Sequence, residues 1–348
     1  MGEKDKSEQE ALVDQCISQK DNDGACKLLF DLIVEYAKEK NFEKAEALHE
    51  KLYETDPMAL TEIVRAGEII EEEKSESVDR EHLEIWSNLY DSISTSEGNA
   101  LYYSMKSKMF QSGEPIMEQG KLNNRLYFIN KGEVKALFNQ GGKENLIKLL
   151  QVGDIIGQEP FFSATVCTVS MVPLSSVKAT YLEVDVLKKW KNDAPALESN
   201  LYDYCMKNDL VKKELEGKSI ERRSDKRINL SGTVVFQLLD KAGKPMGKGY
   251  RGDLSDLSAG GISFIIKSSK KETVRMLLGR RLKISFKLPM KHNAYHKIEQ
   301  LMTVIAAQPQ VFDDYSIHLK FDTKWAQGMI EDIDLSRKAV TLEIPDQE

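Results

Sequence analysis

Hydrophobic residues recur at helical spacing through about the first 75 positions of the chain. One apolar face spans residues 29–36 and a second spans residues 42–53, with a break at Asn41 between them. The Asp56-Pro57 step should end the second helix, because proline disfavours helical backbone at the residue before it. The pattern predicts an α-helical hairpin. Residues 71–77 form a charged run without an apolar period, and this run is predicted to be a linker that follows the hairpin.

The pattern then changes from helical spacing to short alternating runs. A helical stretch over residues 83–103 leads into apolar–polar alternation, with glycines every 7 to 20 residues, up to Gly157. Short strands punctuated by glycine are typical of a small jelly-roll barrel. Helical spacing returns over residues 187–215 and predicts a second helical region after this barrel.

The last third of the chain alternates again. Four apolar runs are bounded by Gly, Pro or Asp turns, and residues 326–335 follow as a closing helix; the runs are 232–236, 261–265, 282–286 and 315–319. The whole chain is therefore predicted to be a multidomain α+β protein. We place its parts at residues 1–78, 79–215 and 216–348.

Composition narrows the class of protein. The 348 residues, 41% of them hydrophobic, provide material for two or three domains, and no run reaches the length of a membrane span. The first residues are acidic and polar, unlike a signal peptide. The four cysteines are scattered without a C-x-x-C pair, so we expect reduced thiols in a cytoplasmic protein that is not bound to a membrane.

The net charge of −7 hides a strong asymmetry along the chain. Residues 1–85 carry 24 acidic and 11 basic side chains, whereas residues 216–348 carry 17 acidic and 23 basic side chains. The basic final third suits an anionic ligand. The acidic first third argues against nucleic acid as the main partner.

Three arginines lie within six residues at the start of that basic region, and they are Arg222, Arg223 and Arg227. Their guanidinium groups repel each other, so stability does not explain the cluster. Each group presents five donors in a planar fork that fits phosphate or the O6/N7 edge of guanine. The cluster therefore predicts a site for an anionic ligand.

A second motif, D-x-S-x-x-G, follows about thirty residues later and precedes an apolar strand. Asp256 and Ser258 supply short polar side chains, while Gly260 and Gly261 allow a close backbone approach or a positive φ. Either motif alone is common on protein surfaces and in turns. In this order, with strands following, the two motifs predict one site.

The pair of motifs resembles the signature of PilZ domains, which are bacterial receptors for cyclic di-GMP. The resemblance covers about residues 221–322 and implies a six-stranded antiparallel β-barrel with a C-terminal helix. It also implies that Arg223 and Arg227 are guanine and phosphate ligands, and that Asp256, Ser258 and Gly261 form the motif at the strand edge. Arg222 stands at a position where an arginine in the family goes with binding of two stacked ligand molecules.

The middle of the chain carries G-E-x-I-x-x-x-G, Y-F-I-x-x-G-x-V-K and G-D-x-x-G, in that order. It resembles the cyclic-nucleotide-binding domain of the catabolite activator family over about residues 85–190. That family holds the cyclic phosphate on a short cassette with a Glu directly after its first glycine and an Arg ten residues after that glycine.

The cassette in this chain is degenerate. Counting from Gly157 places Gln158 at the Glu position and Cys167 at the Arg position, and Glu159 could substitute only by a one-residue slip. A neutral thiol cannot replace a bidentate guanidinium, and residues 149–177 contain no Arg or Lys. We therefore expect weak or no binding of cyclic AMP and a barrel that serves as a scaffold or dimerisation module.

Two helical regions leave alternatives open. Tyr36, Ala45 and Pro57 resemble a tetratricopeptide unit, but no convincing second copy follows, so a plain hairpin without a recognition role is the alternative to a protein-binding one. The apolar stripe of the helical region at residues 187–215 could pack against the same helix of a second copy in a homodimer, or it could pack on the barrel of its own chain. No helix-turn-helix follows it, so direct DNA binding is not expected.

Signatures of catalysis and of metal binding are missing from the sequence. It contains no P-loop, no G-x-S-x-G and no kinase set, so we predict that the protein is not an enzyme and has no cofactor. His292 and His296 have spacing that suits zinc on a helix, but no third ligand lies nearby in the sequence. We predict no metal site.

These inferences combine into one hypothesis with two rivals. The leading one is a cytoplasmic second-messenger receptor that binds cyclic di-GMP on its PilZ domain, rearranges its domains and so regulates a downstream partner. The first rival is an interaction scaffold with degenerate ligand domains, which binds a protein through its N-terminal helices. The second is a dual sensor of cyclic di-GMP and cyclic AMP.

Overall fold

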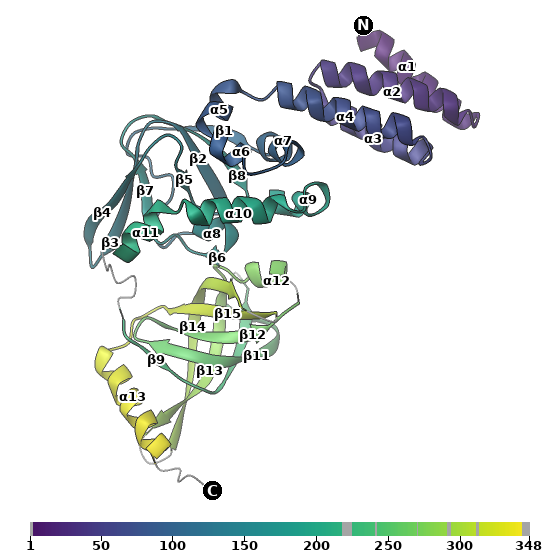
Figure 1. Cartoon of the computed structure of the whole chain (residues 1–348). Coiled ribbons are helices and arrows are strands. Elements are labelled where there is room, and N and C mark those ends of the chain that lie inside the picture. Colours follow the sequence, from purple (N-terminus) through teal and green to yellow (C-terminus); the bar gives the residue numbers. More distant parts are fainter. Residues whose placement is uncertain are drawn as a thin grey trace. The chain divides into compact units, whose positions relative to one another are not determined.

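The chain forms two compact units in a computed structural model, shown in Figure 1. The structure describes residues 3–217, 225–240, 242–269, 271–290, 294–310 and 313–342. The first unit comprises Met1–Met105 with Asp185–Tyr204, and the second comprises Lys106–Val184 with Cys205–Glu348. The three-part division at residues 78 and 215 stays a prediction.

The first unit is helical. Its core gathers the apolar faces of four successive helices, with Leu29, Leu32 and Ile33 fully buried among them. The side chains of Asp21 and Asn41 cap two of these helices by accepting hydrogen bonds from backbone N–H groups three residues on. The helices are α1 (Glu3–Ser18), α2 (Asn22–Lys38), α3 (Phe42–Thr55) and α4 (Leu60–Glu76). The hairpin predicted from residues 29–53 is α2 with α3.

The linker predicted at residues 71–77 is wrong, because α4 continues to Glu76. Tertiary contacts satisfy the polar groups of this last turn. Lys74 is only 7% exposed and forms ion pairs with Glu46 and Glu71. The side chain of Asn99 donates hydrogen bonds to the backbone oxygen of Glu71 and to Ser75, at 2.9 and 3.0 Å. The charged run at residues 71–77 is therefore mostly the end of a helix, and buried ion pairs and hydrogen bonds stabilise it.

Further helices complete this unit around two tryptophans. Trp86 and Trp190 are each 1% exposed, and the indole N–H of Trp190 donates to Ser104 Oγ at 3.1 Å. The helices are α5 (Arg80–Ile85), α6 (Ser87–Tyr90), α7 (Thr95–Tyr103), α9 (Val186–Asp193) and the first part of α10 (Leu197–Lys207).

The apolar stripe of residues 187–215 is covered within the single chain. Leu197, Leu201 and Cys205 are fully buried, and Val211 and Leu215 of α11 (Leu210–Gly217) join the core of the barrel that follows α7 in sequence. Burial within the chain accounts for the stripe without a twin helix. The homodimer stays a prediction.

That barrel belongs to the second unit and consists of two antiparallel sheets. One sheet has the order β1-β8-β2-β5 and the other has the order β4-β3-β7. In β3, Val134, Ala136 and Phe138 point into the core, as the alternating sequence predicts. The elements are β1 (Lys106–Phe110), β2 (Arg125–Lys131), β3 (Val134–Gln140), β4 (Lys143–Leu150), β5 (Ile155–Ile156), α8 (Gln158–Phe162), β6 (Ala164–Thr165), β7 (Ser170–Pro173) and β8 (Val177–Glu183).

The C-terminal barrel contains six main strands, paired in the order β10-β13-β14-β15-β12-β11 and closed by pairing of β11 with β10. A short strand, β9, adds to β11, and α13 follows the last strand (Figure 1). This is the six-stranded antiparallel barrel that the sequence predicted. The elements are β9 (Arg227–Asn229), β10 (Thr233–Leu239), β11 (Pro245–Ser258), β12 (Gly261–Lys267), α12 (Lys271–Arg275), β13 (Arg281–Met290), β14 (Ala294–Pro309), β15 (Asp314–Phe321) and α13 (Gln327–Leu342).

The sequence pattern does not predict two of these strands, β11 and β14. The first half of β11 is glycine-rich and exposed, from Pro245 to Arg251, and β14 begins with exposed polar residues. Neither stretch alternates apolar with polar side chains, so pairing with their neighbours, and not burial, defines these parts of the strands.

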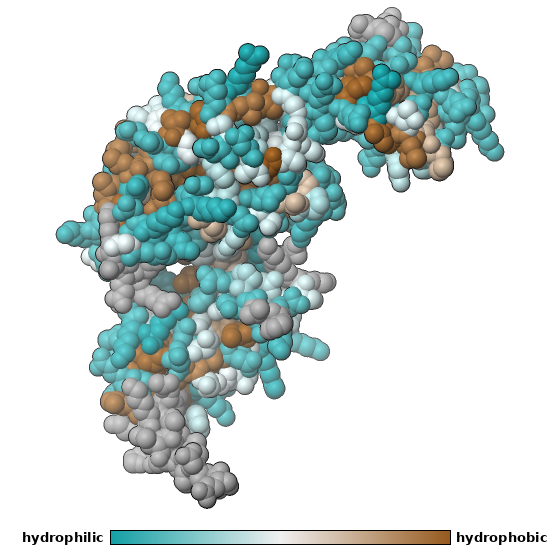
Figure 2. All heavy atoms as spheres, viewed as in Figure 1, coloured by the Kyte–Doolittle hydropathy of each residue, from teal (hydrophilic) through white to brown (hydrophobic). Residues whose placement is uncertain are grey.

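The face shown in Figure 2 is mostly hydrophilic where it is coloured, with hydrophobic side chains gathered on the N-terminal helices and on strands β3 and β4. Exposed apolar side chains between α3 and α4 and along α4 include Met58, Leu60 and Val64, at 80%, 59% and 57% exposure. On β4, Leu146 and Leu149 are each 52% exposed. Within the described residues, no helix combines the length and the apolarity that a membrane crossing requires.

The substitution Asn99→Ala should loosen the end of α4. It removes the buried amide that bonds Glu71 and Ser75, at a cost of about 1–3 kcal/mol in local opening free energy. Hydrogen exchange measured over residues 71–76 should therefore be faster than in the wild type. Asn88→Ala, at an exposed position, is the matched control. Equal exchange in both variants would contradict this account of the helix end.

Candidate functional site

The two motifs of the C-terminal barrel meet through the pairing of β9 with β11. Arg227 lies opposite Ser258 in this ladder, and Asn229 lies opposite Asp256. The guanidinium Nη1 of Arg227 is 3.2 Å from Oδ2 of Asp256. The structure therefore brings together one residue of the arginine cluster and two residues of the D-x-S-x-x-G motif.

The Asp256 carboxylate is fixed from a second side. Ser263 of β12 donates a hydrogen bond of 2.6 Å to Asp256 Oδ2, and the Ser263 residue is only 1% exposed. A β-bulge between Leu254 and Asp256 interrupts the register of β11 against β12 at this point. Bulges commonly redirect a side chain beside a functional site. The carboxylate is thus held between a hydroxyl and a guanidinium.

The turn from Ser258 to Gly261 explains the glycine of the motif. A Cβ on Gly261 would lie 1.9 Å from the backbone oxygen of Leu319, so only glycine allows β12 to start this close to β15. A Cβ on Gly260 would lie 2.8 Å from Asp225 Oδ2. Neither glycine has a positive φ, so close backbone approach is the reason for Gly261, whereas the neighbour of Gly260 is the end of a side chain that can move. Ser258 is buried and donates to the Gly261 oxygen at 3.2 Å.

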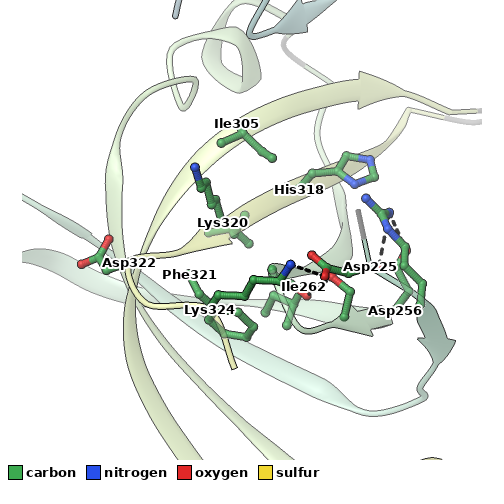
Figure 3. Close-up of a pocket in the computed structure, with 14 residues that line it drawn as sticks. Asp225, Asp256, Ile262, Ile305, His318, Lys320, Phe321, Asp322 and Lys324 are labelled. Carbon is green, nitrogen blue, oxygen red and sulfur yellow. Dashed lines mark hydrogen bonds and ion pairs between the residues drawn. The ribbon is translucent and has the colours of Figure 1, made fainter. Parts of the chain in front are cut away.

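These residues border a hollow of about 540 Å³ on the barrel (Figure 3). This volume falls within the usual range for small-molecule sites. In Figure 3, His318 and Lys320 lie across the hollow from Asp225 and Asp256. Besides these four, the lining includes Arg227, Ser258, Gly260, Gly261, Ile305, Asp322 and Lys324.

The sequence motifs did not predict five of the charged or basic lining residues, one of which is Asp322. Lys324 forms an ion pair with Asp225, whose side chain is 11% exposed, and this pair joins the start of β9 to the segment after β15. His318 and Lys320 reach the hollow from β15. Asp225 lies inside the arginine cluster and could have been noticed there. The β15 residues and Lys324 carry no motif, because only the barrel closure places them here.

The described lining is nearly balanced in charge. Arg227, Lys320 and Lys324 stand against three aspartates of the same hollow. A net positive site for an anionic ligand therefore depends on further cations. The two other arginines of the cluster, Arg222 and Arg223, lie outside the described residues.

The cassette of the middle barrel turns its polar groups toward its own chain. Gly157 has a φ of 94°, and Gln158 after it is 6% exposed and donates from Nε2 to the Ile155 oxygen at 2.9 Å. Glu159 accepts a hydrogen bond of 2.7 Å from Thr168. Both residues that could have taken the family's Glu role are therefore engaged locally.

Cys167, at the position where the family has Arg, lies in the core of that barrel. Its residue is 2% exposed, and burial raises the pKa of its thiol to about 12. A neutral buried thiol offers no charge to a phosphate. That this cassette does not bind a cyclic nucleotide in the usual mode stays a prediction.

The expected absence of a metal site stays a prediction. His292 lies outside the described residues, and His296 lies on β14 opposite Leu288 of β13, not on a helix. Among the residues that the structure describes, no group of three or more His, Cys, Asp or Glu side chains could hold a metal ion.

Comparison with protein families assigns both barrels. Residues 107–191 match the model of the cyclic nucleotide-binding domain, and residues 221–338 match the model of the PilZ domain. The chain therefore carries a cyclic nucleotide-binding domain followed by a PilZ domain, behind an N-terminal helical region.

The curated relatives overlap only part of the chain. The CRP-like cAMP-activated global transcriptional regulator of Mycobacterium tuberculosis, found in two strains, is 26% identical over 114 residues, which are 32% of this chain and 51% of that protein. The chain thus spans about half the length of the curated relatives it matches.

Solved structures also match in part. The N-terminal domain of a transcriptional regulator from Streptomyces coelicolor A3(2) is 22% identical with a TM-score of 0.31, covering 38% of this chain and 89% of that one. A cyclic nucleotide-binding domain from Methylobacillus flagellatus is 20% identical with a TM-score of 0.33, covering 41% of this chain and 78% of that one.

The substitution Gly261→Ala should destabilise the C-terminal barrel by about 2 kcal/mol or more, because the new methyl group collides with the β15 backbone. Urea unfolding followed by circular dichroism should show a lower midpoint. Gly328→Ala, in the exposed first turn of α13 with no atom near its Cβ, is the control and should not lower it. An unchanged midpoint for Gly261→Ala would refute the close-approach explanation.

Thiol labelling should separate the cysteines at pH 8. With its pKa raised to about 12, only on the order of one Cys167 thiol in ten thousand is ionised there, and the thiolate is the reactive form. Cys16, which is partly exposed, should react first. Cys167→Ser should therefore leave the fast-reacting thiol count of the native protein unchanged, whereas Cys16→Ser should lower it. If the Cys167→Ser variant had one fewer fast-reacting thiol than the wild type, Cys167 would be accessible, and the burial of the cassette described here would be wrong.

Proposed function

We propose that this protein is a receptor for cyclic di-GMP and that the hollow on its PilZ domain is the binding site. The observation that carries the proposal is the 3.2 Å contact between Arg227 and Asp256, two residues from separate motifs that meet at the hollow beside Ser258. The match of residues 221–338 to the PilZ domain supports the same ligand.

The chemistry of these side chains suits a guanine nucleotide. A guanidinium carries five donors and can address the O6/N7 edge of guanine or a phosphate, even while one nitrogen contacts Asp256. The Arg227 side chain is 31% exposed, so its remaining donors are accessible. A carboxylate accepts from the N–H groups of guanine, and Ser263 holds Asp256 in position for that task.

The phosphates of the ligand need cations. Lys320 and Lys324 border the hollow, but the aspartates beside them offset much of their charge. Arg222 and Arg223, five and four residues before β9 in the sequence, would supply the missing positive charge, as the family resemblance implies. A dianionic ligand relieves repulsion within the arginine cluster, so binding would draw the segment before β9 onto the barrel.

We propose a different role for the cyclic nucleotide-binding domain. Gln158 and Cys167 are buried and engaged within its own barrel, so this domain acts as a scaffold and not as a cyclic AMP receptor of the usual mode. The named activator of Mycobacterium tuberculosis is cAMP-activated. The present chain departs from the cassette pattern that the family resemblance implies. The whole protein then works as a receptor and not as an enzyme.

The second candidate function is an interaction scaffold that binds a protein through the N-terminal helices. It is favoured by the exposed apolar side chains Met58, Leu60 and Val64, which lie close together in sequence at the start of α4. The two functions are compatible, because a receptor needs a partner that reads its state.

Calorimetric titration with cyclic di-GMP tests the proposal. The wild type should bind with a Kd in the micromolar range or below, with one or two ligands per chain. Arg223→Ala and Arg227→Ala should each weaken binding at least tenfold, because each removes a charged hydrogen bond worth about 1.5–3 kcal/mol. Circular dichroism should show that both variants remain folded.

Arg251→Ala is the matched control, since Arg251 is exposed on β11 but does not line the hollow. Its affinity should equal that of the wild type. Cyclic AMP and GTP serve as ligand controls and should not saturate the protein. Unchanged affinity in both Arg223→Ala and Arg227→Ala, or saturable binding of cyclic AMP alone, would refute the proposed site.

A further inference from the structure

The degenerate cassette takes part in the sheet of the C-terminal barrel. Strand β6 lies within the cassette, and it pairs antiparallel with β14: Thr165 lies opposite Ala306, and Ala164 lies opposite Ala307. The backbone N–H of Val166 also donates to the oxygen of Ile305 at 3.0 Å. Both segments belong to the same compact unit.

The edge of β14 is open to such a strand at this point. Pairing of β14 with β13 ends at Thr303, while β14 itself runs on to Pro309. On the other side, the register against β15 shifts between Val304 and Ala306, which leaves Ile305 at a bulge. Unpaired backbone groups at a sheet edge readily accept another strand, and the cassette occupies this place.

Side chains reinforce the backbone pairing. Ala164 is 4% exposed and belongs to the buried core cluster of the C-terminal barrel. Arg275 of α12 donates a hydrogen bond to the backbone oxygen of Phe161 in α8. Gly279 has a φ of 75°, and a Cβ there would lie 2.8 Å from the side chain of Leu122. Contacts of three kinds therefore join the cassette region to the C-terminal barrel.

One of the residues that receive β6 borders the hollow, and a second pairs with a residue that does. Ile305, which accepts the Val166 N–H, lines the hollow, and Ala306 pairs with His318, which lines it as well (Figure 3). The bulged part of β14 thus has the cassette strand on one edge, and its residue Ile305 forms part of the wall of the candidate ligand site.

We propose that the former phosphate-binding cassette serves in this chain as a docking strand for the PilZ barrel, and that its docking and cyclic di-GMP binding favour each other. The proposal rests on the proposed function of the hollow. The physical reason is preorganisation: docked β6 holds the bulge at Ile305 in one conformation, so the ligand meets a wall that is already ordered. By linkage, the ligand must strengthen docking by the same factor.

The first test is Ala164→Glu, which places a charge where the cassette enters the core of the C-terminal barrel. Without ligand, hydrogen exchange over residues 301–309 should be faster than in the control Ala196→Glu, whose alanine is exposed. With cyclic di-GMP, calorimetry should give a Kd at least about fivefold weaker than in the wild type, at unchanged stoichiometry.

Arg275→Ala is an independent variant, because it removes the contact with Phe161 from the PilZ side and leaves the cassette sequence intact. It should weaken binding in the same direction as Ala164→Glu. This variant also covers the case in which Ala164→Glu does not fold.

The second test uses the wild type alone. Addition of cyclic di-GMP should slow hydrogen exchange of the cassette amides at residues 164–167. If the wild type binds the ligand but cassette exchange is unchanged and Arg275→Ala binds with wild-type affinity, the coupling is wrong and the proposed function stands. If the wild type does not bind cyclic di-GMP at all, the proposed function itself fails. Unchanged exchange over residues 301–309 in folded Ala164→Glu would refute docking.

Discussion

The contact between Arg227 and Asp256 is the interaction on which the candidate site depends. It joins two motifs that are separated by nearly thirty residues, because β9 pairs with β11 beside the bulge that precedes Asp256. Ser263 holds the same carboxylate from β12. A partly exposed guanidinium held against a fixed carboxylate forms a polar surface that is already organised before a ligand arrives.

The two barrels of the chain differ in where they place the residues of their ligand motifs. In the PilZ domain, the polar residues of the motif line a hollow, and Gly261 allows β12 to start close to β15. In the cyclic nucleotide-binding domain, Gln158 and Cys167 are buried in their own barrel. The cassette strand β6 pairs with β14 instead, so one domain adds a short strand to the sheet of the other.

Much of the fold could be predicted from the sequence, because most strands and helices bury one face. The apolar runs that became β10, β12, β13 and β15 were visible as alternation. The sequence pattern wrongly predicts a linker at the end of α4, because the polar groups there are satisfied by Asn99 and Glu46 from other helices, which spacing cannot reveal. For the same reason β11 and β14 were missed: strand pairing, and not burial, defines their polar portions.

The candidate site was predictable as far as its motifs reach. Arg227, Asp256, Ser258 and Gly261 were found by spacing, whereas Lys324 and the β15 residues enter the hollow only through barrel closure. The most direct test of the account is a crystal structure of the full chain with cyclic di-GMP. The account predicts the ligand in the hollow, with the Arg227 guanidinium and the Asp256 carboxylate both in contact with it. A ligand bound elsewhere, with Arg227 and Asp256 still contacting only each other, would contradict it.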